Sequence, residues 1–436
     1  MSNTVLFWHR RDLRINDNTG LFKALTSGFN VQPVFIFDKQ ILSNLAKDDQ
    51  RVAFIYQEIR RLKQQYQSLG TDLLVLYGDP THSIPDLCSE LACSHVFTNS
   101  DYEPYAFIRD NEIKIKLSSV NCAFIEAKDH VIFEKSEVTK DDGLPYTIYT
   151  PYANKWKKQL TEDQLAAFES NEHTHQLRQA NEFTSLISME EMGFEAKIKT
   201  VFPSNLFPET IISNYHETRN FPALSGTSRL SIHLRFGTIS IRALATYALK
   251  HNATYLNELI WRDFYQMIIF HFPKTINNAF KPLYDHINWE RNEVHFQAWC
   301  AGKTGYPLVD AGMRELNETG FMHNRVRMVV ASFLTKHLLL DWRLGEAYFA
   351  EKLLDFELAS NVGGWQWAAG SGCDAAPYFR VFNPTSQQEK FDPTFSYIKK
   401  WVPEFGTSNY PKPIIEHTFA RERILARYKQ ALTSNA

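Results

Sequence analysis

The chain lacks any apolar run long enough to cross a membrane. Nowhere do about 18 apolar residues follow one another, and no small-residue cleavage site follows the first apolar run. The 5 cysteines are an odd number and form no C-x-x-C pair, and no histidine stands beside them at a metal-ligand spacing. We therefore expect a cytoplasmic protein with reduced thiols, no metal site and no membrane contact.

An excess of charge of one sign is also missing. The chain has 47 Lys and Arg against 49 Asp and Glu, a net charge of −2. Any contact with nucleic acid therefore has to come from a local basic patch. Aromatic residues are abundant by contrast, with 32 Phe, 19 Tyr and 9 Trp. Large rings stack on flat ligands, although a bulky helical core accounts for much of such a surplus.

Hydrophobic periodicity divides the 436 residues into regions of different class. Short apolar runs alternate with amphipathic segments over residues 1–126, which predicts an α/β domain with a parallel, Rossmann-like sheet. No G-x-G-x-x-G motif follows the first strand, so a classical dinucleotide site is disfavoured. The pattern weakens over residues 127–204, which predicts a long interdomain connector. Helical periodicity over residues 205–436 predicts an all-α second domain.

The stretch at residues 355–380 has the composition of a site. It reads DFELASNVGGWQWAAGSGCDAAPYFR, where a core segment would carry mostly Leu, Ile and Val. Its Gly-Gly pair lets a backbone or a flat ring approach closely, and Asp355, Glu357 and Asn361 offer partners for a heteroaromatic edge. A Trp-rich core turn with solvated acids is the competing interpretation.

Two further groups in the helical half mix hydroxyls, aromatics and arginines. The segment GTSRLS at residues 226–231 would bind a phosphate if it opened a helix, whereas a simple N-cap at Thr227 or Ser228 is the competing interpretation. A second group recurs at helical spacing and lines one helix face, where a carboxylate and an indole would meet a base edge. An ordinary amphipathic face is the alternative for this group, which consists of Glu258, Trp261, Arg262 and Tyr265.

The segment MHNRVRM places two arginines in different directions. Asn324 and Met328 share a helix face, whereas Arg325 and Arg327 point elsewhere. One arginine can then serve a DNA phosphate and the other a buried carboxylate. Solvated arginines on an ordinary helix are the competing interpretation.

Taken together, these residues resemble the photolyase/cryptochrome family, most closely its class I cyclobutane pyrimidine dimer (CPD) photolyases. The likeness covers nearly the whole chain and is specific as a set. Its motifs are RRDLRINDN, YTIYTPY, TSRLS, NELIWRDFY, KTGYPLVDAGMR, MHNRVRM, DWRLGE, NVGGWQWAAG, DAAPYFRVFNP and KFDP.

The resemblance implies a helical domain that binds FAD. It places Asp355 in a pair with Arg327 beside the flavin and Asn361 opposite flavin N5. One departure from the family is Glu357, which stands where relatives carry Asp. Electrons are expected to reach the flavin through Trp289, Trp342 and Trp365. The residues expected to bind FAD are Tyr215, Thr227, Ser228, Arg229, Leu230, Ser231, Glu258, Arg262, Tyr265, Asn324, Arg327, Asp355, Glu357 and Asn361.

The activity that the resemblance implies is light-dependent DNA repair by a monomeric carbon–carbon lyase. Photoexcited reduced FAD would transfer an electron to a flipped-out CPD, with Glu258, Asn324 and Asn361 as catalytic residues. A cryptochrome-type blue-light photosensor and a (6-4) photolyase are the alternatives, although the latter would carry His in place of Asn324. The residues expected to contact the dimer are Glu258, Trp261, Asn324, Met328 and Trp367, and those expected to contact DNA phosphates are Arg219, Arg325 and Arg380.

A second, antenna chromophore is expected in the α/β domain. Ligands of open α/β folds lie beyond the carboxyl ends of the strands, where the loops at residues 10–18 and 101–109 are expected. The segment YEPYA lacks the Asn-Glu pair of folate-binding relatives, which favours a deazaflavin or a flavin over folate. The competing interpretation is that Arg10, Arg11 and Arg14 simply pair with nearby acids.

Overall fold

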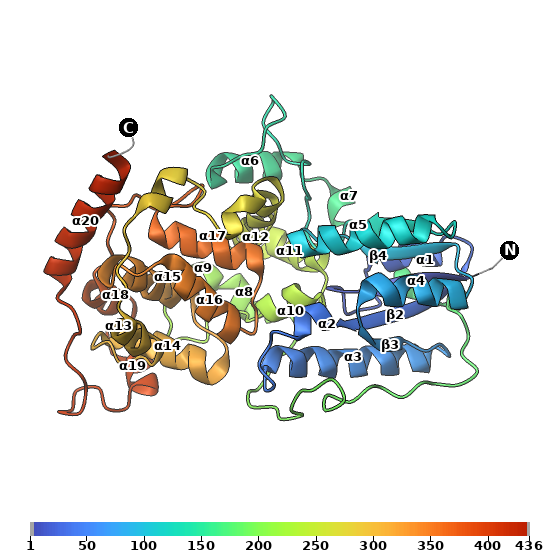
Figure 1. Ribbon diagram of the computed structural model, residues 1–436, viewed down its shortest axis with the longest axis horizontal. Coiled ribbons are helices and arrows are strands. Elements are labelled where there is room, and N and C mark those ends of the chain that lie inside the picture. Colours follow the sequence, from blue (N-terminus) through green and yellow to red (C-terminus); the bar gives the residue numbers. More distant parts are fainter. Residues whose placement is uncertain (1–3, 434–436) are drawn as a thin grey trace. The chain divides into compact units, whose positions relative to one another are not determined.

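The computed structural model describes residues 4–433, which form two compact units (Figure 1). The first unit consists of the described chain up to Glu137 together with Gln159–Phe207 and Leu230–Lys250. The second consists of Val138–Lys158, Pro208–Arg229 and the chain from His251 onward. These units divide the chain differently from the boundaries expected at residues 126 and 204, because most of the expected connector belongs to the first unit.

The first unit contains the expected parallel sheet, so the predicted α/β fold class is confirmed. Five parallel strands are arranged in the order β3-β2-β1-β4-β5. The order reverses beside β1, which places the loop that follows β1 at the switch point where ligands of such sheets bind. The strands are β1 (Thr4–His9), β2 (Asn30–Asp38), β3 (Leu74–Gly78), β4 (His95–Asn99) and β5 (Ala123–Ala127).

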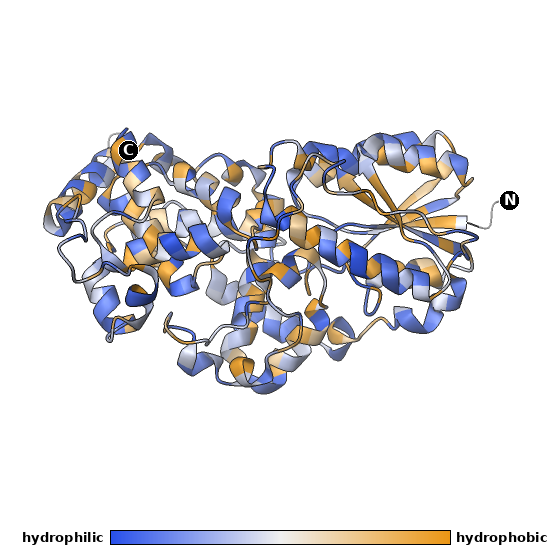
Figure 2. Cartoon of the chain, turned by 90° about the horizontal axis from the view of Figure 1, so that it is seen from below, coloured by the Kyte–Doolittle hydropathy of each residue, from blue (hydrophilic) through white to orange (hydrophobic). Residues whose placement is uncertain are grey.

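Helices cover both faces of this sheet, and the strands are correspondingly apolar (Figure 2). Val5 and Phe7 pack in one core with residues of α1 (Thr19–Leu25) and α3 (Gln50–Ser68). Leu6 and Trp8 point to the opposite face, because side chains alternate along a strand, and pack with α4 (Pro80–Glu90) and α5 (Pro104–Ser118). The unit also includes α2 (Lys39–Leu42), α7 (Glu162–Leu165), η1 (Ser170–Gln176), α10 (Ser231–Phe236) and most of α11 (Ile241–His251).

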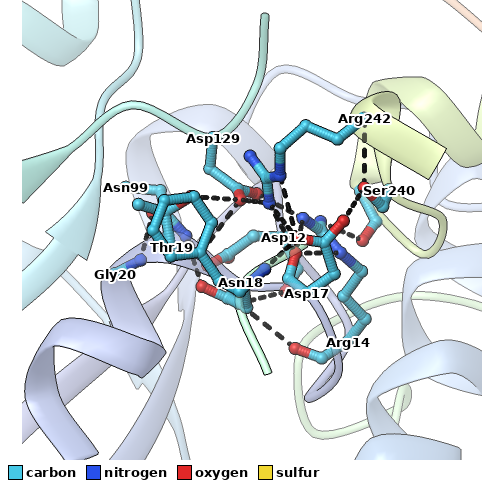
Figure 3. A network of polar contacts seen from close by, with 12 residues as sticks. Asp12, Arg14, Asp17, Asn18, Thr19, Gly20, Asn99, Asp129, Ser240 and Arg242 are labelled. Atoms are coloured by element: carbon cyan, nitrogen blue, oxygen red, sulfur yellow. Dashed lines mark hydrogen bonds and ion pairs between the residues drawn. The ribbon is translucent and has the colours of Figure 1, made fainter. Parts of the chain in front are cut away.

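A buried polar network ties the loop after β1 to residues far along the chain (Figure 3). Arg242 lies 2.7 Å from Asp17 and 2.8 Å from Asp129, and Arg14 lies 2.7 Å from Asp129. Burial alone would raise the pKa of Asp129, but Arg14 and Arg242 hold it well below its usual range. The network therefore anchors α11 to the sheet within the first unit.

The second unit is helical, as expected for the carboxyl-terminal part of the chain. Its largest core joins residues of α13 to α17. No helix in the range 4–433 combines the length and the apolar character that a bilayer span requires. The helices are α6 (Tyr149–Gln159), α8 (Glu209–Ser213), α9 (Tyr215–Thr218), α12 (Ala253–His271), η2 (Pro273–Ile276), η3 (Pro282–His286), α13 (Glu293–Cys300), α14 (Pro307–Thr319), α15 (Asn324–Ser332), η4 (Phe333–His337), α16 (Trp342–Lys352), α17 (Leu358–Ala369), α18 (Pro384–Phe391), α19 (Ser396–Trp401) and α20 (His417–Thr433).

Candidate functional site

The helix α12 presents the carboxylate and the indole expected for a base-binding face. It begins after Asn252, whose side chain accepts hydrogen bonds from the first-turn N–H groups of Thr254 and Tyr255. Glu258 lies 2.6 Å from Nη1 of Arg219, and both side chains are partly exposed. Burial raises the pKa of the Glu258 carboxyl, and the charge of Arg219 opposes this rise. A carboxyl group with a raised pKa therefore lies at a partly exposed position.

Glu357 has a defined partner despite its departure from the family pattern. Nη2 of Arg262, on α12, lies 3.1 Å from the Glu357 carboxylate, and both side chains are buried. Glu357 also accepts a hydrogen bond of 3.2 Å from Ser360 Oγ in the first turn of α17. The extra methylene of Glu357 is thus accommodated by an ion pair between α12 and α17.

The two arginines of α15 serve separate partners, as their spacing predicts. Nη2 of Arg327 donates to both carboxylate oxygens of Asp355, at 3.2 and 3.1 Å, which is the pair expected from the resemblance. Arg325 instead donates to Oδ1 of Asn220 at 2.6 Å and contacts the sulfur of Met328 at 3.7 Å. Asn324 is exposed at the start of the same helix.

The structure brings the three expected phosphate-binding arginines close together. Burial lowers the pKa of Arg325, and the positive charges of Arg219 and Arg380 lower it further. Arg380 lies over the ring of Phe382, at 5.4 Å, and this ring lies 6.5 Å from the ring of Trp367. An anion bound at this group would relieve the repulsion on Arg325, while Arg219 already has a carboxylate partner in Glu258.

His323 marks a second place where an anionic group fits. Its Nδ1 caps α15 by accepting the N–H of Arg325 at 3.1 Å, and its Nε2 is buried without a partner among residues 4–433. Burial lowers the pKa of His323 to about 4, and the charges of Arg325, Arg327, Arg219 and Arg229 add to this effect. Three of these four arginines have carboxylate neighbours: Glu258 for Arg219, Asp355 for Arg327 and Glu315 for Arg229. Arg325 and the unpaired His323 nitrogen are therefore the groups best placed to meet an anionic ligand.

Asn361 offers a hydrogen-bond acceptor in a buried place. Its Nδ2 donates to the main-chain oxygen of Glu346 at 3.0 Å and to Oε1 of Glu346 at 2.8 Å. No donor within the described part of the chain reaches Oδ1, so the amide oxygen remains to accept an N–H such as that of a reduced flavin. Glu346 belongs to the motif DWRLGE, but its role cannot be inferred from the sequence, because it depends on this tertiary contact.

The segment at residues 227–231 does not cap a helix in the way that the competing interpretation required. The helix α10 begins after Leu230, and no side chain caps its first turn in the described structure. Ser228 Oγ lies 2.8 Å from the hydroxyl of Tyr255. The ring of Tyr255 in turn contacts the ring of Tyr215, with the two centroids 5.1 Å apart. Arg229 has a φ of 54°, a left-handed conformation that is rare for residues other than glycine. The phosphate-binding interpretation of this segment remains a proposal.

Two of the three expected electron-carrying tryptophans lie deep in the helical core. Trp365 and Trp342 are buried, and the half-buried Trp289 packs against the same core. A Cβ at Gly345 would lie 2.1 Å from Cη2 of Trp365, so glycine allows this indole to lie on the first turn of α16, which begins at Trp342. No sequence pattern indicates Trp299, which is buried and meets Trp365 edge-on at 6.1 Å.

Tyr149 is a further residue of the site whose role does not follow from its motif, YTIYTPY. Its ring stacks on the indole of Trp261 with the centroids 3.6 Å apart and the planes at 4°. Its hydroxyl donates to the main-chain oxygen of Asn257 at 2.8 Å, and its N–H donates to Asp374 at 3.0 Å. Only the tertiary structure shows that this tyrosine belongs to the α12 face.

In the loops of the α/β unit that are expected to bind an antenna, several polar side chains are already bonded to other residues of the protein. Arg10 lies 2.5 Å from Asp110, and Arg11 lies 3.1 Å from Asp101. Tyr105 donates to Asp38 at 2.7 Å. These arginines do pair with acids, but with acids distant in the sequence and not with the neighbouring Asp12 and Asp17. The antenna itself stays a prediction.

Comparison with known proteins agrees with this geometry. Residues 5–171 match the family described as DNA photolyase, and residues 255–408 match the FAD binding domain of DNA photolyase. A deoxyribodipyrimidine photo-lyase of Synechococcus sp. is 37% identical, with 99% of this chain and 97% of that protein covered.

Solved structures of photolyases are similar over the whole chain. A bacterial class III photolyase from Agrobacterium tumefaciens superposes with a TM-score of 0.88 at 32% identity, covering 99% of this chain and 98% of that one. An archaeal photolyase from Sulfolobus tokodaii, solved with two FAD molecules, gives a TM-score of 0.83 at 33% identity, covering 98% of this chain and 100% of that one. The chain therefore belongs to the DNA photolyase family, and its residues 255–408 form an FAD-binding domain of that type.

Proposed function

We propose that the protein repairs cyclobutane pyrimidine dimers in DNA under blue or near-ultraviolet light. The observation that carries this proposal is the group of Arg219, Arg325 and Arg380, in which burial and then the charges of the other two arginines lower the pKa of Arg325. Arg219 of this group is paired with the α12 carboxylate Glu258 at 2.6 Å. Phosphate contacts position a nucleic acid, whereas carboxylates and indoles recognise a base extruded from the stack.

The residues that would hold FAD are Tyr215, the segment 227–231, Arg327 with Asp355, and Asn361. Bound FAD supplies the light-excited electron that opens the cyclobutane ring and receives that electron again afterwards. Asn361 offers its amide oxygen to the proton at flavin N5, and Glu346 fixes the orientation of that amide through two hydrogen bonds. Burial keeps water away from Asn361, which is 8% exposed.

Binding of DNA would change the partner of Glu258. A phosphate that binds Arg219 would remove this arginine from Glu258, with which it is paired at 2.6 Å. The pKa of the Glu258 carboxyl, already raised by burial, would then rise further. The Glu258 side chain would then be available to hydrogen-bond the dimer, and Trp261 and Trp367 would supply stacking surfaces for the two bases.

The decisive experiment incubates the purified protein with an oligonucleotide that contains one CPD, in light and in darkness. Light-dependent loss of the dimer supports the proposal. An unchanged dimer would refute it and leave the cryptochrome-type photosensor, whereas repair of a (6-4) photoproduct in place of the CPD would point to the other alternative. Gel filtration with light scattering tests the proposed monomer, and cell fractionation tests the cytoplasmic location.

We further propose an antenna chromophore in the α/β unit, with a flavin or a deazaflavin preferred to folate. The Sulfolobus tokodaii photolyase contains two FAD molecules, which supports a flavin in this role. The absorption spectrum of the purified protein and mass spectrometry of the compounds released by heat test the proposal. Release of FAD in a 1:1 ratio to the chain, even after incubation with candidate chromophores, would contradict it.

A further inference from the structure

Tyr149 occupies one face of an indole that the proposed function requires. The two rings are parallel within 4° and their centroids are 3.6 Å apart, so Tyr149 covers that face of Trp261. A planar ring has only two faces for stacking, and the lesion can therefore use only the other one while Tyr149 stays in place.

Several contacts hold the Tyr149 ring where it lies. Its hydroxyl donates to the carbonyl of Asn257, which precedes Trp261 by one turn of α12, and its N–H donates to the Asp374 carboxylate. Phe264, also on α12, meets the edge of both rings, at 5.9 Å from Tyr149 and 5.7 Å from Trp261. The tyrosine is thus attached to the same helix as the indole on which it stacks.

We propose that Tyr149 is a positioning residue for lesion recognition, a fixed backing that holds the Trp261 indole at the angle at which a flipped-out base stacks on its other face. This inference rests on the proposed function. The hydroxyl bond to Asn257 and the edge contact with Phe264 favour a backing that stays in place over a plug that the lesion displaces, because displacement of the ring would break both of them together with the stack on Trp261.

The experiment compares Tyr149→Phe with Tyr149→Leu in the FAD-bound protein. Phenylalanine keeps the stack and loses only the bond to Asn257, whereas leucine removes the stack. Binding to CPD-containing DNA and to undamaged DNA is measured at one salt concentration. We expect Tyr149→Leu to weaken CPD binding by about ten-fold, within the range known for stacking on one base, and to leave undamaged DNA binding unchanged. Tyr149→Phe should stay within about three-fold of the wild type.

A double variant tests whether Tyr149 acts through Trp261. If it does, Tyr149→Leu added to Trp261→Ala causes no further loss of lesion preference. The matched control is Tyr146→Leu, in the same segment, because Tyr146 has its ring contact with Tyr152, at 6.3 Å, and should leave the preference unchanged. FAD content and melting temperature are recorded for each variant, and Tyr149→Met replaces Tyr149→Leu if the latter does not fold.

Three results would overturn the inference. Tighter CPD binding by Tyr149→Leu would identify the tyrosine as a plug. Equal weakening for damaged and undamaged DNA would reduce Tyr149 to a structural residue at the start of α6. Full additivity with Trp261→Ala would show that it does not act through the indole. Failure of the proposed function itself is distinguishable, because the wild-type protein would then bind both DNAs alike.

Discussion

Gly363 and Gly364 are neighbours in the middle of α17 but have opposite surroundings, and this difference allows a sharp test of the α12–α17 contact. A Cβ at Gly363 would lie 2.3 Å from ring carbons of Tyr265, on α12, whereas a Cβ at Gly364 would meet nothing within 4 Å. Alanine in a helix interior is more stable than glycine by about 0.5–1 kcal/mol. Forcing an extra methyl group against a packed ring costs about 1–3 kcal/mol.

The two substitutions should therefore change the free energy of unfolding in opposite directions. We expect Gly364→Ala to raise it by about 0.5–1 kcal/mol. Gly363→Ala should lower it by roughly 0.5–2 kcal/mol, the cost of overpacking less the gain in helix propensity. Because both changes add one methyl group to the same helix, the difference between the variants isolates the clash with Tyr265.

Urea unfolding followed by far-ultraviolet circular dichroism gives the midpoints and slopes for the three proteins at equal FAD saturation. A third variant, Tyr265→Ala, removes the ring, and in that background Gly363→Ala should become stabilising. Equal midpoints for the two glycine variants, or a clash that persists without the Tyr265 ring, would refute the reasoning. Such a result would mean that α17 moves away from α12 at little cost.

The other predictions concern binding and pH. Arg325→Ala should weaken the binding of damaged and undamaged DNA alike and reduce the slope of log affinity against log salt by about one, measured by titration at several salt concentrations; a selective loss of CPD binding would contradict this role. Trp367→Ala should instead reduce the difference in binding free energy between damaged and undamaged DNA, by about 1–3 kcal/mol per stacked base, and leave the slope of log affinity against log salt unchanged. The pKa of His323 is about 6.5 in the unfolded chain and about 4 in the folded protein. Because the unfolded chain then binds a proton more readily, the free energy of unfolding should fall as the pH falls from 6.5 to 4. His323→Asn keeps a capping oxygen and removes this loss, about 3 kcal/mol by linkage; a stability difference between wild type and variant that is the same at pH 7.5 and pH 4 would contradict it.

Local patterns in the sequence were sufficient to predict the secondary-structure elements and part of the candidate site. The continuous apolar run from Val5 to Trp8 predicts a strand buried on both faces, because successive side chains of a strand point to opposite faces of the sheet. The spacing of Glu258 and Trp261 likewise places both on one helix face without knowledge of the tertiary structure. Arg327 and Asp355 could be paired only through the resemblance, since 28 residues separate them.

The remaining features depend on contacts between distant segments. Tyr149 stacks on a ring more than 100 residues away, at Trp261, and no local pattern encodes that contact. Glu346 is one acid among 49 Asp and Glu until its bond to Asn361 is seen. The sequence also does not show that residues 230–250 belong to the α/β unit, because their helical periodicity resembles that of the sequence that follows.

The buried network around Asp129 has a consequence for how the protein is made. The chain passes from one unit to the other after residues 137, 158, 207, 229 and 250, so the first unit is completed only when α11 has emerged from the ribosome. Until then Asp17 and Asp129 lack Arg242, and burying them with only Arg14 as a counter-charge would leave negative charge uncompensated in the interior. A nascent chain that stops near residue 204 should therefore hold its sheet only loosely, and the first unit should complete its fold only after residue 250 has been made.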